Sequence, residues 1–140
     1  MGAWGVGIFE DDVNLDWIEE GYAEGGVEAV RGALSLAAES SAGDYLEYED
    51  CATARVAAEV VATCFDAPHP NLGRDNKETL LAHQDDVQQD RELIDLALSA
   101  SVRLASENAE LHELWIESEE AAAQWTSEME GLVTRLRGAQ

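Results

Sequence analysis

The Ala/Val-rich stretch from residue 47 to 66 constrains the fold of this chain more than any other feature. Several of its larger apolar side chains recur at spacings of three or four, and alanine fills much of the rest; they are Tyr48, Cys51, Val56, Val60, Cys64 and Phe65. That spacing is typical of a helix, and alanine has the highest helix propensity. We therefore expect a helix over 47–66 that is the most buried in the chain. The prolines in the sequence at 67–71 end it, because proline cannot continue a helix.

Two helices are expected before this stretch. Asp11 or Asp12 is a suitable N-cap for the first, and Gly25-Gly26 breaks it. Its apolar side chains are Val13, Trp17, Ile18 and Tyr22. The second helix follows directly, with Val27, Val30, Leu34 and Ala37 or Ala38 at helical spacing. Residues 40–46 indicate a loop.

After the central stretch, residues 72–88 are polar and weakly patterned, with a possible helical turn at 78–83. A helix is expected from Asp90 to about Ser106, with the stripe Ile94, Leu98, Val102 and Ala105. Asn108 is expected to cap the last helical region, and Ser118 marks a possible break. Its inner positions alternate by four and three: Leu111, Trp115, Ser118, Ala122, Trp125, Met129, Leu132 and Leu136. A helix hairpin that closes the bundle is the expected form.

These segments together predict an all-α fold. The sequence contains no convincing strand run, no internal repeat and no second domain, and 140 residues suit one domain. We expect residues 1–140 to form a single-domain bundle of about five helices. The N-terminal segment is expected to pack into or across its core.

The charge excludes some classes of partner. Thirty acidic residues oppose eight basic ones, which gives a formal net charge of -22. Nucleic acid and anionic membranes both require cationic surfaces, so we expect the chain to bind neither. The charge attracts cations and basic proteins. It equally suits a solvated surface tuned to a salty host or to solubility, and both readings stay open.

Cys51 and Cys64 are the only cysteines, and both fall in the helix expected at 47–66. Thirteen helical residues separate them by roughly 20 Å, whereas a disulfide needs Cα atoms within about 7 Å. They are expected to be buried free thiols in a reducing cytoplasm. No run of residues approaches the ~18 apolar positions of a membrane span.

The opening run Met-Gly-Ala-Trp-Gly-Val-Gly-Ile-Phe-Glu-Asp-Asp lacks the basic and apolar regions of a signal peptide, so we expect it to stay on the mature protein. Gly2, Gly5 and Gly7 permit sharp bends that bring Trp4 and Phe9 into the core. An exposed aromatic patch for a partner is the alternative.

This run, followed by Asp16-Trp17, resembles the start of the domain of unknown function 4259 family. The Ala/Val helix from Cys51 to Ala62 and the segment Glu107-Asn108-Ala109-Glu110-Leu111-His112-Glu113-Leu114-Trp115 are similar to the same family. The resemblance implies a small, mostly bacterial, soluble single-domain protein. It implies no activity, substrate or catalytic residue.

One surface is a candidate for partner binding. Tyr45 and Tyr48 stand among four acids, and rings beside carboxylates can hold the Arg or Lys of a basic partner. The whole set is Asp44, Tyr45, Glu47, Tyr48, Glu49 and Asp50. A solvated helix start is the alternative interpretation.

Other constellations give no chemistry. The acids Glu10, Asp11, Asp12 and Asp16 could hold a divalent cation, but helix capping accounts for them without a ligand. His69, His83 and His112 lack the spacing of metal ligands. A nucleophilic cysteine needs a base and an accessible thiol with a lowered pKa, and an Ala/Val-rich helix offers neither. We expect no catalytic residue, no metal and no cofactor.

The resulting hypothesis is a non-catalytic acidic protein that binds a basic protein, as an inhibitor, an immunity protein or a mimic of nucleic-acid charge. A hydrolase-type enzyme that uses clustered carboxylates and a metal is the alternative, and it would require three or more acids converging with a histidine in one pocket. A housekeeping protein whose acidity reflects its host is the third possibility.

Overall fold

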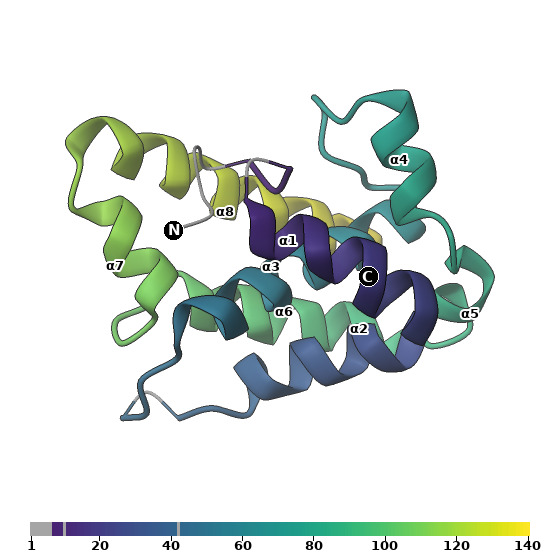
Figure 1. Cartoon of the computed structure of the whole chain (residues 1–140), viewed down its shortest axis with the longest axis horizontal. Coiled ribbons are helices and arrows are strands. Elements are labelled where there is room, and N and C mark those ends of the chain that lie inside the picture. Colours follow the sequence, from purple (N-terminus) through teal and green to yellow (C-terminus); the bar gives the residue numbers. More distant parts are fainter. Residues whose placement is uncertain (1–6, 10, 42) are drawn as a thin grey trace.

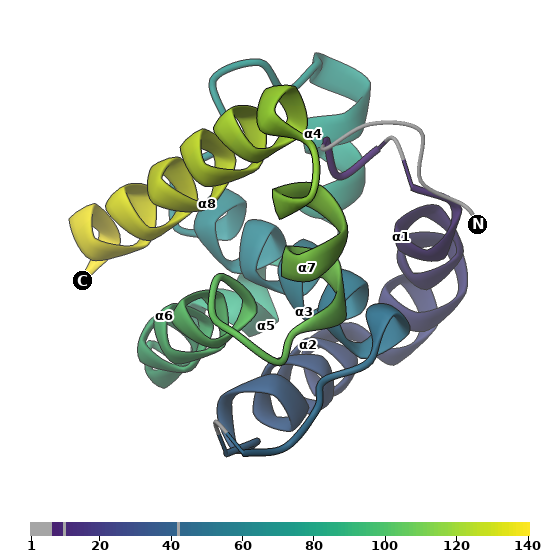
Figure 2. The same ribbon diagram turned by 90° about the vertical axis from the view of Figure 1, so that its left-hand side faces the viewer.

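Helix α3 (Tyr48–Cys64) forms the centre of the computed structural model, which describes residues 7–9, 11–41 and 43–140. Thirteen of its seventeen residues are buried. Figure 2 shows the other helices around it, and each of α1, α2, α4, α5, α6, α7 and α8 contacts it. Alanine on several faces allows this close approach from many sides. The expectation that this is the most buried helix is confirmed.

The first helical part of the chain is sharply bent (Figure 1) and consists of α1 (Asp12–Asp16), a π-helical stretch η1 (Trp17–Tyr22) and α2 (Ala23–Ala38). The Asp11 side chain accepts the Val13 N–H at 2.9 Å and caps it, as expected. Gly26 interrupts it with φ 59° and ψ -137°. Glycine tolerates that non-helical conformation, so the expected break at Gly25-Gly26 is confirmed as a kink that joins two helices.

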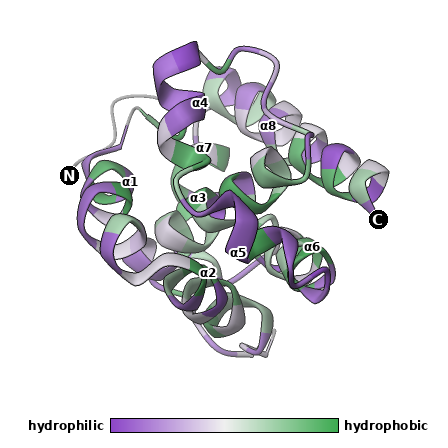
Figure 3. Cartoon of the chain, turned by 90° about the vertical axis from the view of Figure 1, so that its right-hand side faces the viewer, coloured by the Kyte–Doolittle hydropathy of each residue, from purple (hydrophilic) through white to green (hydrophobic). Residues whose placement is uncertain are grey.

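Two short helices follow α3: α4 (Arg74–Leu80) and α5 (Gln84–Gln88). In Figure 3 most of α4 is hydrophilic, which agrees with the exposure of residues 73–79. The Tyr22 hydroxyl anchors this region: it donates to the Leu80 carbonyl at 2.6 Å and accepts the His83 N–H at 3.1 Å. These helices account for most of the difference from the five that we expected.

Helix α6 (Glu92–Leu104) packs against α2, α3 and α8, and it buries a different face from the one expected. Ile94 is buried as expected, but Val102 is 57% exposed. Leu93, Ala97, Ala100 and Leu104 complete the buried apolar face. The expected stripe was therefore partly wrong. Helix α6 packs against three helices, so it buries a wide face, and small alanines occupy part of that face.

Helices α7 (Glu110–Ile116) and α8 (Glu119–Ala139) form the expected closing hairpin. Ser118 marks the break between them, and its side chain caps α8 by accepting the Ala121 N–H. The inner positions Leu111, Trp125, Met129, Leu132 and Leu136 are buried as expected, whereas Ser118 is exposed and Trp115 and Ala122 are half-buried. Asn108 was wrong as the N-cap of α7: Ala109 occupies that position, and Asn108 has φ 64°.

The fold is all-α over the residues that the structure describes, with a single isolated β-bridge between Leu46 and Ala109. Phe9 is partly buried against the core, as expected, while Trp4 lies outside the described residues. Within the described ranges, every helix is too short or too polar to span a membrane.

Candidate functional site

The six residues expected to bind a partner lie in the loop before α3 and in its first turn. Asp44, Tyr45, Glu47 and Glu49 are exposed, and Tyr45 is 52% exposed. The structure adds Glu113 of α7, whose carboxylate accepts the Tyr45 hydroxyl at 2.9 Å. We refer to Asp44, Tyr45, Glu47, Glu49 and Glu113 as the acidic tyrosine face.

Tyr48 and Asp50 belong less clearly to this surface, because both are half-buried. The Tyr48 hydroxyl donates a short hydrogen bond to Asp11, so it joins the start of α3 to the start of α1. Burial first, and this bond second, raise the pKa of the Tyr48 hydroxyl. Tyr48 therefore positions two helices, and Tyr45 is the ring that the face presents to solvent.

Backbone pairing brings the acidic residues of α7 to this face. The Leu46 N–H donates to the Asn108 carbonyl at 2.7 Å, and the Glu110 N–H donates to the Leu46 carbonyl at 2.9 Å. The Glu110 side chain in turn accepts the Tyr48 N–H at 2.9 Å. Glu110 and Glu113 were not predicted to belong to this surface. Their spacing of three places them on one side of α7, but only the bridge places that side beside residue 45.

Local contacts shift the pKa values of two groups of the face. Hydrogen bonds from the backbone and hydroxyl of Ser41 hold the pKa of Asp44 below its ordinary value. Partial desolvation, followed by the bond to Glu113, raises the pKa of Tyr45 to about 12. At neutral pH Asp44 is therefore ionised and the Tyr45 phenol beside it is protonated.

Arg103 lies just behind this face and contributes little positive charge to its surface. It is 8% exposed, and its guanidinium donates to the carbonyls of Asp44 at 2.8 Å and of Asn108 at 3.2 Å. These bonds hold the loop against the start of α7. The charge of Arg103 is thus used inside the fold.

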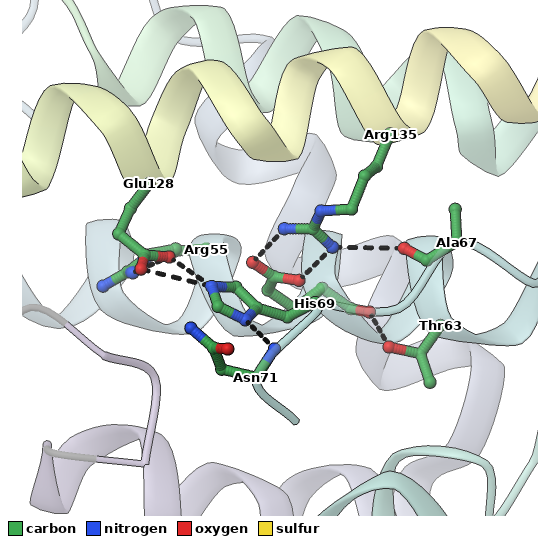
Figure 4. Close-up of polar contacts among 8 residues, drawn as sticks. Arg55, Thr63, Ala67, His69, Asn71, Glu128 and Arg135 are labelled. Atoms are coloured by element: carbon green, nitrogen blue, oxygen red, sulfur yellow. Dashed lines mark hydrogen bonds and ion pairs between the residues drawn. The ribbon is translucent and has the colours of Figure 1, made fainter. Parts of the chain in front are cut away.

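A second candidate lies between α3 and α8, where charged side chains meet at a small cleft (Figure 4). Arg135 donates two hydrogen bonds to buried Glu59, at 2.8 and 2.9 Å, and a third to the Ala67 carbonyl at 3.1 Å. His69 Nε2 lies 2.9 Å from Glu128, which is also 3.8 Å from Arg55. The cleft has a volume of about 280 Å³.

The hydrogen bonds of His69 assign its tautomer. Nδ1 accepts the Asn71 N–H at 3.0 Å, so the proton is on Nε2 and is donated to Glu128. Both ring nitrogens are therefore engaged, and both carboxylates, of Glu59 and Glu128, have cationic or N–H partners. The cluster joins α3, α8 and the loop at 67–71 to one another.

Buried arginine is the unusual element of this cluster. Arg55 is 3% exposed, and its guanidinium stacks over the Trp125 ring at 5.2 Å. Burial lowers the pKa of Arg55, while Glu59 and Glu128 act in the opposite direction. The cleft thus combines two acids with a histidine, rather than the three acids that the hydrolase hypothesis requires.

The remaining candidates have structural partners. Asp11 caps α1 and accepts from Tyr48, while Glu10 lies outside the described residues. No group of three His, Cys, Asp or Glu side chains within the described ranges is placed to hold a metal ion. Cys51 and Cys64 are buried free thiols, as expected, and burial raises the pKa of Cys64 to about 11.

Fold and surface together define a small helical protein with an acidic exterior. A family model described as a domain of unknown function (DUF4259) matches residues 2–128, and the chain belongs to this family. No curated protein matches the chain. No solved structure matches it either.

Proposed function

We propose that this chain is a non-catalytic binding protein that recognises a basic protein through the acidic tyrosine face. The single observation that carries the proposal is the exposed Tyr45 ring among carboxylates from two separate segments. A tyrosine supplies contact area, and the acids around it select Arg or Lys on the partner. An inhibitor, an immunity protein and a mimic of nucleic-acid charge all act in this way.

The negative charge of the exterior supports the proposal. Arg55, Arg103 and Arg135 are three of the eight bases, and all three are occupied in the interior or in bonds across the fold. Asp11 and Glu59 are buried as well and balance buried Arg55 and Arg103, so the exterior keeps a charge close to -22. Such a surface speeds the encounter with a cationic protein and repels nucleic acid.

The charged cluster between α3 and α8 also supports a non-catalytic role. Both nitrogens of His69 are already engaged, and the Glu59 carboxylate is held by Arg135. A general base needs a free lone pair directed at its substrate. We extend the proposal to a cytoplasmic location, for which the two free thiols are the support.

Capture from a lysate of the source cell, followed by kinetics on the captured protein, tests the proposal. We expect a basic partner whose association rate constant falls steeply between low and physiological salt, because steering over long distances is screened beyond about 8 Å at 0.15 M. A neutral or acidic partner with kinetics independent of salt would contradict it. Binding of duplex DNA at physiological salt would contradict it as well.

A further inference from the structure

A groove of about 630 Å³ lies between α6 and α8, which pack side by side (Figure 2). Its walls combine apolar side chains, among them Val102, Met129 and Val133, with serine, threonine, histidine and charged side chains. Val102 is the most exposed of the large apolar residues identified on the described surface, at 57%. Small-molecule sites have this size and character, with a few polar groups that orient the ligand.

Ser101 supplies the first such polar group. The residue lines the groove and is 0% exposed, yet its hydroxyl has no hydrogen-bond partner within the described part of the chain. A buried hydroxyl without a partner is unfavourable for the fold. A ligand that bonds to this oxygen would remove that cost.

His112 supplies the second polar group, from α7. Its Nδ1 accepts the indole N–H of Trp125 at 3.0 Å, which places the ring proton on Nε2. Among the described residues, Nε2 donates to no protein acceptor. The ring also lines the groove, so it offers a donor to an acceptor group on a ligand.

We propose that the groove binds an uncharged small molecule with an apolar body and a carbonyl or amide acceptor. The groove has one acidic and one basic lining residue, Glu130 and Arg137, so it selects neither sign of charge. A second copy of the chain is disfavoured as the occupant, because each copy has a net charge of -22. This proposal is independent of the acidic tyrosine face.

Nile red is a suitable probe, because it is neutral, flat and apolar, has a ring carbonyl and fluoresces in apolar sites. We expect saturable binding with one dye per chain. Val102→Asp should raise the half-saturation concentration by about tenfold or more, since it places a carboxylate against the bound apolar body. The matched control is Leu36→Asp on α2, where the side chain is 49% exposed and does not line the groove.

Equal binding by both aspartate variants, or no saturable binding to the unmodified chain, overturns the proposal. Light scattering on the same samples addresses the other occupant. A dimer that Val102→Asp converts to a monomer would make the groove an interface between copies, and it would overturn the proposal too.

Ser101→Ala separates a ligand contact from a structural role. The unfolding temperature should stay the same or rise, because an unpaired buried hydroxyl is removed and alanine favours helix. Dye affinity should fall by about 2- to 10-fold, the effect of one lost hydrogen bond. Unchanged affinity, or a lower unfolding temperature, would overturn the role assigned to this hydroxyl.

Discussion

At the scale of single residues, the pair Glu59–Arg135 is the contact whose loss should cost most. Glu59 is 2% exposed, and two hydrogen bonds join it to Arg135. Arg135→Met leaves a buried carboxylate without its partner, so we expect the free energy of unfolding to fall by about 3–5 kcal/mol in urea titrations. The double variant Glu59→Leu/Arg135→Met should recover most of the lost free energy of unfolding, because it leaves no unpaired buried charge. A single variant as stable as the unmodified chain would show that the pair contributes nothing.

The buried thiols predict a loss of stability at alkaline pH. Burial raises the pKa of Cys64 from 9.0 to about 11, so the folded state keeps this proton after the unfolded state has lost it. The contribution of the Cys64 thiol to the free energy of unfolding should therefore be complete below about pH 9 and should decrease as the pH rises towards 11. Cys64→Ala should flatten this fall in denaturant titrations across that range. The same slope in both proteins would assign the loss to other groups, of which the Tyr22 hydroxyl is one.

At the scale of elements, two glycines of α2 should respond to alanine in opposite directions. Gly26 has φ 59°, where a Cβ is strained and would lie 3.4 Å from the His83 ring. Gly32 lies in the same helix, and a Cβ there meets nothing within 4 Å. Gly26→Ala should lower the free energy of unfolding by about 1 kcal/mol or more, and Gly32→Ala should raise it by about 0.5–1 kcal/mol. Matching changes in urea midpoints would mean that the kink at Gly26 is not needed.

Elements that bury one face could be predicted from the sequence, and those that depend on distant partners could not. The spacing of the apolar residues and the alanine content predict α3, and the glycine at residue 26 predicts the kink in α2. The exposed Val102 shows the limit. The helical pattern of α6 offers two possible buried faces, one with Val102 and one with residues 93 and 97, and packing against three helices buries the second. Helices α4 and α5 are polar, and the distant Tyr22 hydroxyl anchors this region.

The candidate surface shows the same limit. Tyr45 and its acidic neighbours could be read from local sequence, whereas Glu113 joins them only through the Leu46–Ala109 bridge. The cluster around His69 was not anticipated, because its members come from α3, α8 and a loop. No local pattern relates residue 59 to residue 135, since their contact follows from how α8 packs on α3.

At the scale of the whole molecule, self-repulsion among the acids should make stability depend on salt. The chain has a net charge of -22, and the two buried arginines are balanced by two buried acids. Raising NaCl from about 0.01 to 0.15 M shortens the screening length from about 30 to 8 Å, so the unfolding temperature should rise. Calorimetry over this range measures the effect. A lower unfolding temperature at the higher salt would mean that attractive ion pairs outweigh repulsion.

The central claim is that a particular face, rather than net charge alone, recognises a basic partner. Two double variants test this claim, and each removes two negative charges. Glu47→Gln/Glu49→Gln changes the face, and Asp85→Asn/Asp86→Asn is the control away from it. Glu47, Asp85 and the other two acids are exposed at helix starts, and Figure 1 shows the start of α3 and α5 towards opposite ends of the molecule.

The decisive measurement is the rate constant for association of each variant with the captured partner at low salt. We predict that the variant at residues 47 and 49 associates several-fold more slowly than the variant at residues 85 and 86, because local charges steer docking most strongly. Equal rates for the two variants would contradict the claim that the acidic tyrosine face is the binding site.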